Sequence, residues 1–251
     1  MSTGSHPPHA AESERSHFDA LVDETGEIWW GSTTPAAKLR LNRRVQLFCR
    51  ALDKFSDPRV LEIGCGTGAF TGPVLEARPT LRLDAFDVSP KAVETAQQRF
   101  GRFERATFYV GTAEKVEVPD NSYDAVMGVS VLHHIPLDVC LKESLRVLKP
   151  GGLFWFSEPN YLNPQIVLER KVPVMRRWLQ VSPDETAFVR WKLAAQLRAA
   201  GFRTVHIKPF DFLHPSTPPA LMRALDAASH VIEAVPLLRE ISGSLLVVAY
   251  K

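Results

Sequence analysis

The stretch VLEIGCGTGAF, residues 60–70, decides the fold of this chain. It begins like an ordinary buried strand, yet the carboxylate of Glu62 stands among its apolar residues. Gly64, Gly66 and Gly68 follow, and three glycines so close together weaken any regular element. A glycine turn from a strand into a helix lets the backbone approach a ligand and points the free N–H groups of the helix at it. The stretch therefore predicts a ligand site.

Composition narrows the class of protein. The 251 residues are 45% hydrophobic and 23% charged, as in a soluble globular protein, and the net charge of +2 gives no field that favours nucleic acid. Cys49, Cys65 and Cys140 are odd in number and widely spaced, which argues against disulfides or a zinc site. No apolar run is long enough to span a membrane, and the N-terminus lacks a signal peptide's apolar centre. We predict a cytoplasmic protein with no metal site and no nucleic-acid partner.

Strand and helix patterns alternate outward from the opening stretch. Strands are predicted over 59–63, 81–88, 106–111, 123–132 and 153–159, and helices over 36–55, 70–77, 89–100 and 137–148. This alternation implies right-handed crossovers and a parallel sheet covered on both faces. In the first helix we expect Arg40, Arg43, Arg44 and Lys54 on a solvated face, off the apolar stripe.

The C-terminal third is less regular. Ser182 to Glu185 has the form of a capping box, which predicts a helix that runs to Ala200 and ends at Gly201. Two late strands, over 202–210 and 243–250, flank a helix over 218–235 and predict a hairpin-like addition to the sheet edge. We expect residues 1–17 to be disordered and residues 18–251 to form a single domain.

The second strand ends at Asp87, 23 residues after Gly64, where an acid can accept hydrogen bonds from both hydroxyls of a ribose. Gly64, Gly66 and Ala69 also satisfy the dinucleotide fingerprint in its Gly/Ala form. The ligand could thus be a dinucleotide or a nucleoside without phosphate. Glu62 distinguishes the two, because a carboxylate repels a pyrophosphate and attracts an ammonium or sulfonium. The buried acid therefore favours a positively charged nucleoside without phosphate.

Four motifs in register resemble the class I S-adenosylmethionine-dependent methyltransferases. They are VLEIGCGTGAF, DAFDVSP, GTAEKVEVPDNSYDAVMGVSVLHHI and LKESLRVLKPGGLFWFSEP. The resemblance covers residues 60–159, and more loosely the first helix and the last strands. It implies an α/β, Rossmann-like, doubly wound sheet of seven strands in the order 3-2-1-4-5-7-6, with the last strand antiparallel and helices on both faces. The implied cofactor is S-adenosyl-L-methionine.

The resemblance also implies which residues hold that cofactor. Glu62 and the turn residues Gly64, Cys65, Gly66, Thr67 and Gly68 hold the methionine part; Asp87 binds the ribose, Val88 packs on the adenine, Ala113 and Glu114 lie at its edge, and Val129 lies below the cofactor. One position departs from the pattern, since many members carry an acid where this chain has Thr112. The resemblance therefore implies that backbone groups or Glu114 recognise the adenine instead of the Thr112 side chain. Cys65 is interpreted as a small turn residue, because nothing nearby would activate its thiol.

Three residues are candidates for catalysis. Alignment supplies most of the rate of methyl transfer, and a hydroxyl acceptor also needs a base. His133 and His134 follow the fourth strand, and Glu158 ends the fifth. Each also has a structural interpretation: His133 lines the pocket, while His134 and Glu158 hydrogen-bond a loop. The sequence leaves these alternatives open.

Two segments are predicted to cover the site. One is the N-terminal lid over 18–56, with Trp29 and Trp30, and the other is a helical cap inserted over 160–182, with Tyr161 and Met175. The cap has an apolar stripe and several cations, so residues 166–181 are also a candidate peripheral membrane contact.

These observations predict a methyltransferase for a small or lipid-like metabolite, with O-, N- and C-acceptors all open. Two alternatives stay. One is a methyltransferase for tRNA or protein, which no Asn-Pro-Pro-Tyr-type signature or charge excess supports. The other is a protein that binds S-adenosylmethionine for different chemistry. The oligomeric state is not predicted.

Overall fold

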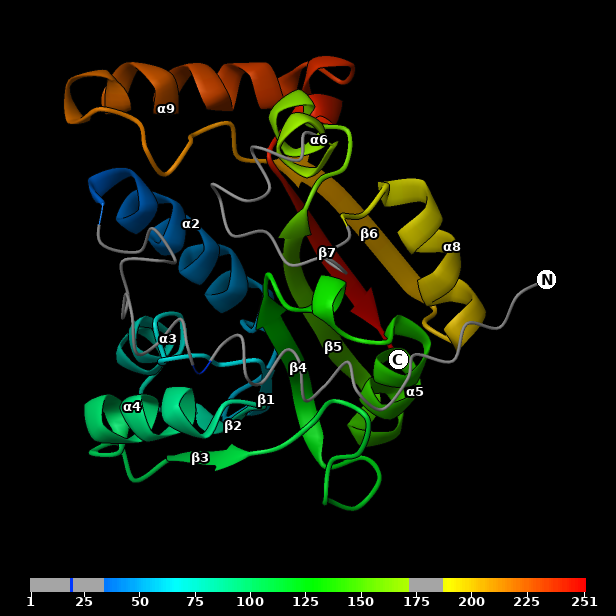
Figure 1. Cartoon of the computed structure of the whole chain (residues 1–251). Helices are drawn as coiled ribbons and strands as arrows, with labels where there is room; N and C mark the ends of the chain where they lie inside the picture. The colour runs from blue at the N-terminus through cyan, green and yellow to red at the C-terminus, as the bar shows by residue number, and fades with distance from the viewer. Residues whose placement is uncertain (1–18, 20–33, 172–186) are drawn as a thin grey trace.

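Seven strands form one sheet in the order β3-β2-β1-β4-β5-β7-β6 (Figure 1). The computed structural model describes Asp19, residues 34–171 and residues 187–251. The strands are β1 (Arg59–Ile63), β2 (Arg82–Asp87), β3 (Ala106–Val110), β4 (Tyr123–Val129), β5 (Leu148–Pro159), β6 (Thr204–Phe210) and β7 (Ser244–Tyr250). β7 runs antiparallel to both of its neighbours, and the other pairings are parallel. The predicted strand order and the antiparallel last strand are confirmed.

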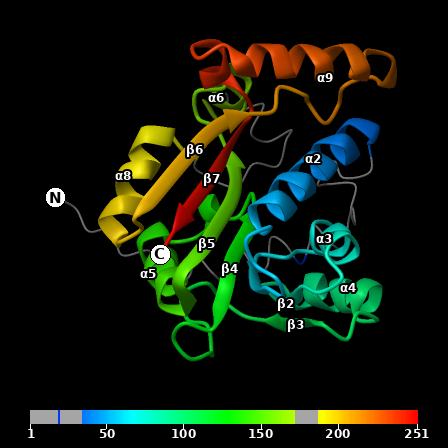
Figure 2. The ribbon, with the colours of Figure 1, turned by 180° about the vertical axis from the view of Figure 1, so that it is seen from behind.

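Helices cover both faces of the sheet. α2 (Pro35–Ala51), α3 (Thr71–Ala77) and α4 (Pro90–Phe100) pack on one face, and α5 (Leu137–Val147) and α8 (Arg190–Ala200) pack on the other. α6 (Pro164–Lys171), α9 (Pro219–Ala234) and the short 3₁₀ helices η2 (Leu132–His134) and η3 (Leu238–Ile241) complete the described elements. Figures 1 and 2 both place α6 and α9 beyond the carboxyl ends of β5 and β6. None of the described helices combines the length and the hydropathy needed to cross a bilayer.

The two faces of β5 explain why the core divides into two halves. Side chains alternate across a strand, so Trp155 faces α2 while Phe154 and Phe156 face α5 and α8. Trp155 packs against Phe48 of α2, with ring centroids 5.1 Å apart. On the other face, Phe154 lies 4.9 Å from Phe202, which precedes β6. A long apolar run therefore becomes a strand buried on both faces.

Some predicted boundaries were wrong. α2 ends at Ala51, four residues before the predicted end, and β5 begins at Leu148 instead of Leu153. α8 begins only at Arg190, because Phe188 is extended and pairs with Asn160. The capping box at 182–185 lies outside the described residues. Ser89 does cap α4 as predicted, since its side chain accepts the Ala92 N–H.

Arg40, Arg43 and Arg44 of α2 do not lie on a solvated face, which corrects the sequence prediction. Arg44 is buried, and its Nη2 lies 2.8 Å from Asp211 Oδ2. Arg40 Nε lies 2.7 Å from the same oxygen, and Arg43 donates two hydrogen bonds to the Glu233 carboxylate. Burial alone would raise the pKa of Asp211, but Arg44 and Arg40 hold it below its ordinary value. Of the four cations expected on a solvated face, Lys54 alone is exposed.

We expect Arg44→Met to lower the free energy of unfolding by about 3–5 kcal/mol, because it removes one partner of a buried carboxylate. Urea denaturation measures the change. Arg50→Met is the matched control on the exposed side of the same helix, and we expect it to stay within about 0.5 kcal/mol of the parent. Equal stability of the two variants would contradict a stabilising role for the Arg44–Asp211 pair.

Candidate active site

The glycine turn between β1 and α3 is locked to the end of β2. The N–H groups of Gly64 and Cys65 donate to the Phe86 carbonyl oxygen at 2.9 and 3.0 Å. Gly64 and Gly66 have φ values of +69° and +52°, in the left-handed region that favours glycine. A Cβ on Gly64 would lie 2.4 Å from Val131 Cγ2, whereas open space lies in front of Gly66. The turn is thus packed on one side and open on the other, as close approach to a ligand requires.

Two acids lie beside this turn. Glu62 is buried, and its Oε2 accepts a hydrogen bond from Thr71 Oγ1 at 2.7 Å. Asp87 accepts from the N–H groups of Gly66 at 2.9 Å and Ser89 at 3.0 Å, so it joins the turn to the start of α4. Thr71 is a partner that sequence reasoning missed, since no local pattern links it to Glu62.

Burial sets the electrostatics of the site. It raises the pKa of Glu62 to about 7, against the lowering effect of the Thr71 hydrogen bond and with added repulsion from Asp87. Burial also raises the pKa of Asp87, although backbone N–H groups oppose it. A cation beside these two acids would stabilise their ionised forms and offset the cost of burial, whereas a pyrophosphate would be repelled by those forms. The residues present therefore fit S-adenosylmethionine, whose ammonium and sulfonium groups are cationic, better than a dinucleotide.

The remaining cofactor candidates lie near the ends of neighbouring strands. Val88 follows Asp87, and Val129 is the last residue of β4. Gly111 donates its N–H to the Asp87 carbonyl oxygen at 3.0 Å, which ties the segment after β3 to the second strand. Ala113 in that segment is buried, whereas Thr112, Glu114 and Lys115 are exposed.

Cys65 and Thr67 are both buried in the turn. Burial, and the nearby Glu62 and Asp87, raise the pKa of the Cys65 thiol well above its ordinary value. The thiol therefore stays protonated, in line with its interpretation as a small turn residue.

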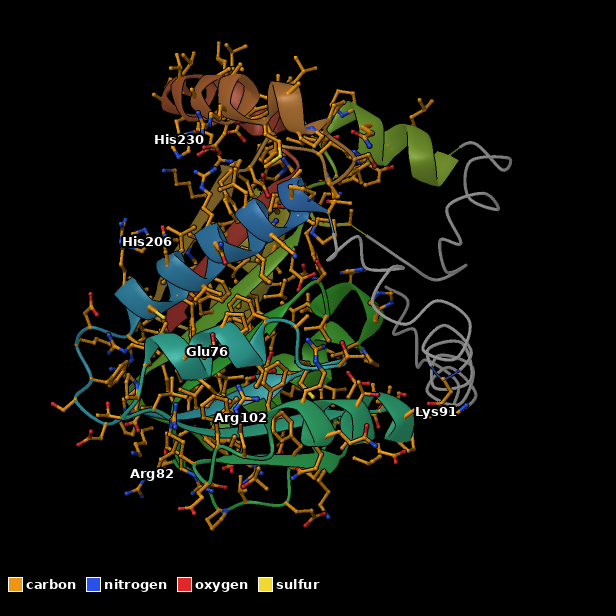
Figure 3. The ribbon with its side chains drawn as sticks, turned by 90° about the vertical axis from the view of Figure 1, so that its left-hand side faces the viewer. Glu76, Arg82, Lys91, Arg102, His206 and His230 are labelled. Atoms are coloured by element: carbon orange, nitrogen blue, oxygen red, sulfur yellow. The ribbon has the colours of Figure 1, made fainter. Side chains whose placement is uncertain are left out.

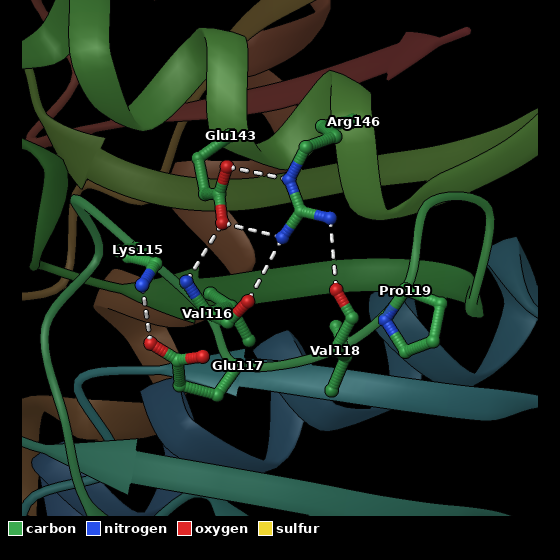
Figure 4. Close-up of a pocket in the computed structure, with 7 residues that line it drawn as sticks. All are labelled: Lys115, Val116, Glu117, Val118, Pro119, Glu143 and Arg146. Atoms are coloured by element: carbon green, nitrogen blue, oxygen red, sulfur yellow. Dashed lines mark hydrogen bonds and ion pairs between the residues drawn. The ribbon is translucent and has the colours of Figure 1, made fainter.

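The segment between β3 and β4 is held in place from α5 (Figure 4). Arg146 donates to the carbonyl oxygens of Val116 and Val118, each at 2.8 Å, while Glu143 accepts the Val116 N–H at 2.7 Å. A surface hollow of about 550 Å³ lies among these groups. Because these side chains are engaged with the loop backbone and with each other, we assign them to loop support instead of ligand binding.

Glu158 organises the loop after β4. Its carboxylate is buried at the end of β5, and Oε1 accepts the N–H groups of Val131 and Leu132, both at 3.0 Å. Oε2 lies 2.8 Å from His133 Nδ1. His133 is buried, and its ring centroid lies 4.1 Å from that of His134, which is partly exposed. The structure thus brings all three catalytic candidates together, with Glu158 oriented toward the loop.

The structure describes only part of the two segments predicted to cover the site, the N-terminal lid over 18–56 and the cap over 160–182. Trp29, Trp30 and Met175 lie outside the described residues. Tyr161 is partly buried, and its N–H donates to the Phe188 carbonyl oxygen at 2.9 Å. The neighbouring Asn160 donates from Nδ2 to the carbonyl oxygens of Glu240 and Ser242, at 2.7 and 2.8 Å. The segment after β5 is therefore anchored to the segment before β7.

Comparisons with known proteins point to methyltransferases. Residues 61–156 match the family model described as "Methyltransferase domain". A demethylmenaquinone methyltransferase from Tropheryma whipplei is 28% identical over 180 residues, which are 65% of this chain and 74% of that protein. A probable phthiotriol/phenolphthiotriol dimycocerosates methyltransferase 2 from Mycobacterium ulcerans is 34% identical over 104 residues, 41% of this chain and 40% of that protein.

The fold also matches a solved structure. N-methyltransferase NodS from Bradyrhizobium japonicum, in complex with S-adenosyl-L-homocysteine, superposes with a TM-score of 0.62 at 17% identity. The match covers 96% of this chain and 98% of the other.

The matched segment, the strand order and the acids beside the glycine turn define one class of protein. The chain is a methyltransferase with the class I fold, and residues 61–156 match a methyltransferase domain. Its cofactor is S-adenosylmethionine. The predictions of family, fold, enzyme class and cofactor are confirmed, and the assignments of individual site residues stay predictions.

We expect the affinity for S-adenosylmethionine to rise by up to about tenfold between about pH 6 and pH 8. Without ligand, the Glu62 carboxyl, with its pKa of about 7, is mostly protonated at the lower pH and mostly ionised at the higher one. A neighbouring cation lowers that pKa, so binding below the pKa releases a proton. Isothermal titration in buffers of different ionisation enthalpy measures both effects. Glu62→Gln should bind more weakly and without this pH dependence, and a flat profile for the parent would contradict the assignment.

We expect Asp87→Ala to weaken S-adenosylmethionine binding by well over tenfold. Two ribose hydroxyls would lose a charged acceptor, at roughly 1.5–3 kcal/mol each. Titration calorimetry measures the affinity, and a thermal unfolding curve checks that the variant folds. Asp57→Ala, at an exposed position before β1, is the matched control and should bind like the parent. Unchanged affinity in Asp87→Ala would place the ribose elsewhere.

Proposed function

We propose that this methyltransferase transfers the methyl group of S-adenosylmethionine to a small or lipid-like acceptor at the carboxyl ends of β4 and β5. The names of the two relatives support this class of acceptor, because both name lipid-like substrates. The observation that carries the use of a cationic methyl donor is the pair of buried acids Glu62 and Asp87, which have no ion-pair partner among the described residues. Glu62 and the turn would hold its methionine part, and Asp87 its ribose.

His133 is the proposed base for a hydroxyl acceptor, and Glu158 is the residue that positions it. A carboxylate at Nδ1 orients an imidazole and stabilises its protonated form, as a base needs when it takes a proton. Glu158 itself is a poorer base, since its oxygens already accept two backbone N–H groups and face His133. His134, the more exposed of the two histidines, is the second candidate.

The remaining residues would form the walls of the site. Val88, Ala113 and Glu114 would surround the adenine, and Val129 would lie beneath the cofactor. Tyr161, in the segment after β5, would border the acceptor pocket. Alignment of the acceptor with the methyl group contributes to the rate whichever base is used.

Label transfer tests the class of acceptor. The protein is incubated with methyl-labelled S-adenosylmethionine and three separate pools: a lipid extract, a pool of polar metabolites, and a pool of tRNA and protein. Label in a lipid or metabolite, identified by mass spectrometry, would support the proposal. Label confined to tRNA or protein would contradict it.

With a hydroxyl acceptor, we expect His133→Ala to lower turnover about 10²- to 10⁴-fold at unchanged cofactor affinity. Glu158→Gln should lower turnover less and move the rising part of the pH–rate profile to lower pH, because a neutral amide stabilises the imidazolium less than a carboxylate does. A purely structural role of Glu158 would not move the profile.

His134→Ala is the matched control and should keep near-normal turnover. Normal turnover in His133→Ala with a loss in His134→Ala would move the base to His134. Normal turnover in both would mean that alignment alone drives the reaction.

A further inference from the structure

The most deeply buried side chains of α9 are polar. Among its sixteen residues only Ser229 and Glu233 are buried. Glu233 forms two hydrogen bonds with Arg43 of α2, at 2.8 and 2.6 Å, and its Oε1 also accepts the Asp211 N–H at 2.8 Å. A helix that covers a core normally buries an apolar stripe. In α9 the buried residues are polar and only Met222 and Ile232 are partly buried among its large apolar ones, so the exposed Leu221, Leu225 and Val231 are available to something outside the described fold.

Those apolar residues gather with others on neighbouring elements. Eight of the ten large apolar side chains exposed among the described residues lie here: Leu168, Leu221, Leu225, Val231, Val235, Leu237, Leu238 and Ile241. We call these eight residues the apolar face. At 100° per residue, its four members in and just after α9 fall within about 120° of the helix circumference. Leu237, at the turn into η3, is the most exposed at 84%.

Hydrogen bonds hold the elements of this face together. Asn163, just before α6, donates from Nδ2 to the Ile241 carbonyl oxygen at 2.8 Å. Asn160 donates to the carbonyl oxygen of Glu240 in η3 at 2.7 Å. Figures 1 and 2, which view the protein from opposite sides, both show α6 next to the C-terminal end of α9. The apolar face is therefore a built surface and not a set of scattered side chains.

The charges around the apolar face are unequal. Glu233 pairs with Arg43 and Glu240 pairs with Arg190 at 2.6 Å, whereas Asp226 has an ionic partner in His230 only when that histidine is protonated. Asp226 lies 4.0 Å from His230, which Figure 3 labels on α9. Arg223 is exposed and has no ion-pair partner among the described residues. Arg239 Nε lies 3.8 Å from the same Glu240 carboxylate. With the neighbouring Arg43, Arg190 and Arg223, the described arginines at this surface outnumber its acids Asp226, Glu233 and Glu240, and this positive excess complements an anionic surface.

We propose that α9, η3 and the exposed side of α6 form a docking surface for an anionic lipid bilayer. Leu237 and Leu238 protrude at a turn, which suits insertion among lipid chains better than flat packing between two copies of the chain. The surface lies at the carboxyl edge of the sheet, where the acceptor is expected to enter, so docking delivers a lipid-like acceptor to the site. That purpose rests on the proposed function, but binding to a bilayer does not.

This surface differs from the membrane contact predicted over 166–181. Only residues 166–171 of that segment are described, and of them Leu168 belongs to the apolar face. The described surface comes mainly from α9 and η3, which no sequence motif singled out.

Vesicle flotation tests the proposal without any acceptor. We expect the protein to float with vesicles that contain phosphatidylglycerol, and less with vesicles of phosphatidylcholine alone. Leu237→Asp combined with Leu238→Asp should lower partitioning more than tenfold, since it replaces two inserted side chains by charges. Arg223→Glu should lower it several-fold, with a weaker dependence on salt.

Two matched controls make the same chemical changes elsewhere. Val110→Asp alters an exposed apolar residue on β3, and Arg82→Glu alters an exposed arginine at the opposite edge of the sheet, which Figure 3 labels. Both should float like the parent. Titration of each variant with S-adenosylmethionine checks that the fold is intact.

Several results would overturn the proposal: no flotation of the parent, equal flotation of the parent and the leucine variant, or a dimer in light scattering that Leu237→Asp dissociates. The last result would assign the face to a second copy. Flotation without label transfer to lipid would contradict the proposed acceptor class and leave the docking surface standing.

Discussion

Backbone N–H groups beyond the carboxyl ends of the strands need acceptors, and in this protein carboxylates at those ends supply them. Asp87 after β2 binds the N–H groups of Gly66 and Ser89. Glu158 in β5 binds those of Val131 and Leu132. Asp211 after β6 accepts the Leu213 N–H at 3.3 Å. An unpaired buried N–H is costly, so these acids fix the loops that build the site.

The buried acids near these strand ends, Glu62 among them, differ in how their charge is compensated. Asp211 has Arg40 and Arg44 beside it. Glu62 and Asp87 have no ion pair among the described residues, and burial raises the pKa of each. A cationic ligand would compensate the charge of these two carboxylates. The loop contacts of Asp87 and the preference for a cationic cofactor therefore both arise from the burial of these acids. The cost of keeping these acids buried is recovered when that ligand binds.

The sequence predicted the elements best where one local pattern decides the structure. β1, the Ser89 cap and α9 follow from apolar periodicity and turn residues, and all lie where predicted. The prediction failed where a distant partner decides. Arg44 looked like a surface cation because Asp211 is far along the chain, and the start of α8 was misplaced because Phe188 pairs with Asn160.

The candidate site divides in the same way. Strand-end positions could be read from the motifs, so Glu62, Asp87, His133 and Glu158 were all identified as candidates. The separate role of each residue could not be predicted, because it depends on which atoms are in contact in the folded protein. That Glu158 faces the loop through one oxygen and His133 through the other is a property of the folded chain.

The attachment of α9 by charge also has a consequence for how the surface evolves. A helix held by its apolar stripe cannot change that stripe without loss of stability. α9 is held instead by a two-point Arg43–Glu233 pair that is largely shielded from solvent, which is stronger than an exposed pair. Its outward residues are therefore released from the demands of the core. They can be selected for what they touch outside the protein, while Arg43 of α2 keeps the helix at the edge where the acceptor is expected to enter.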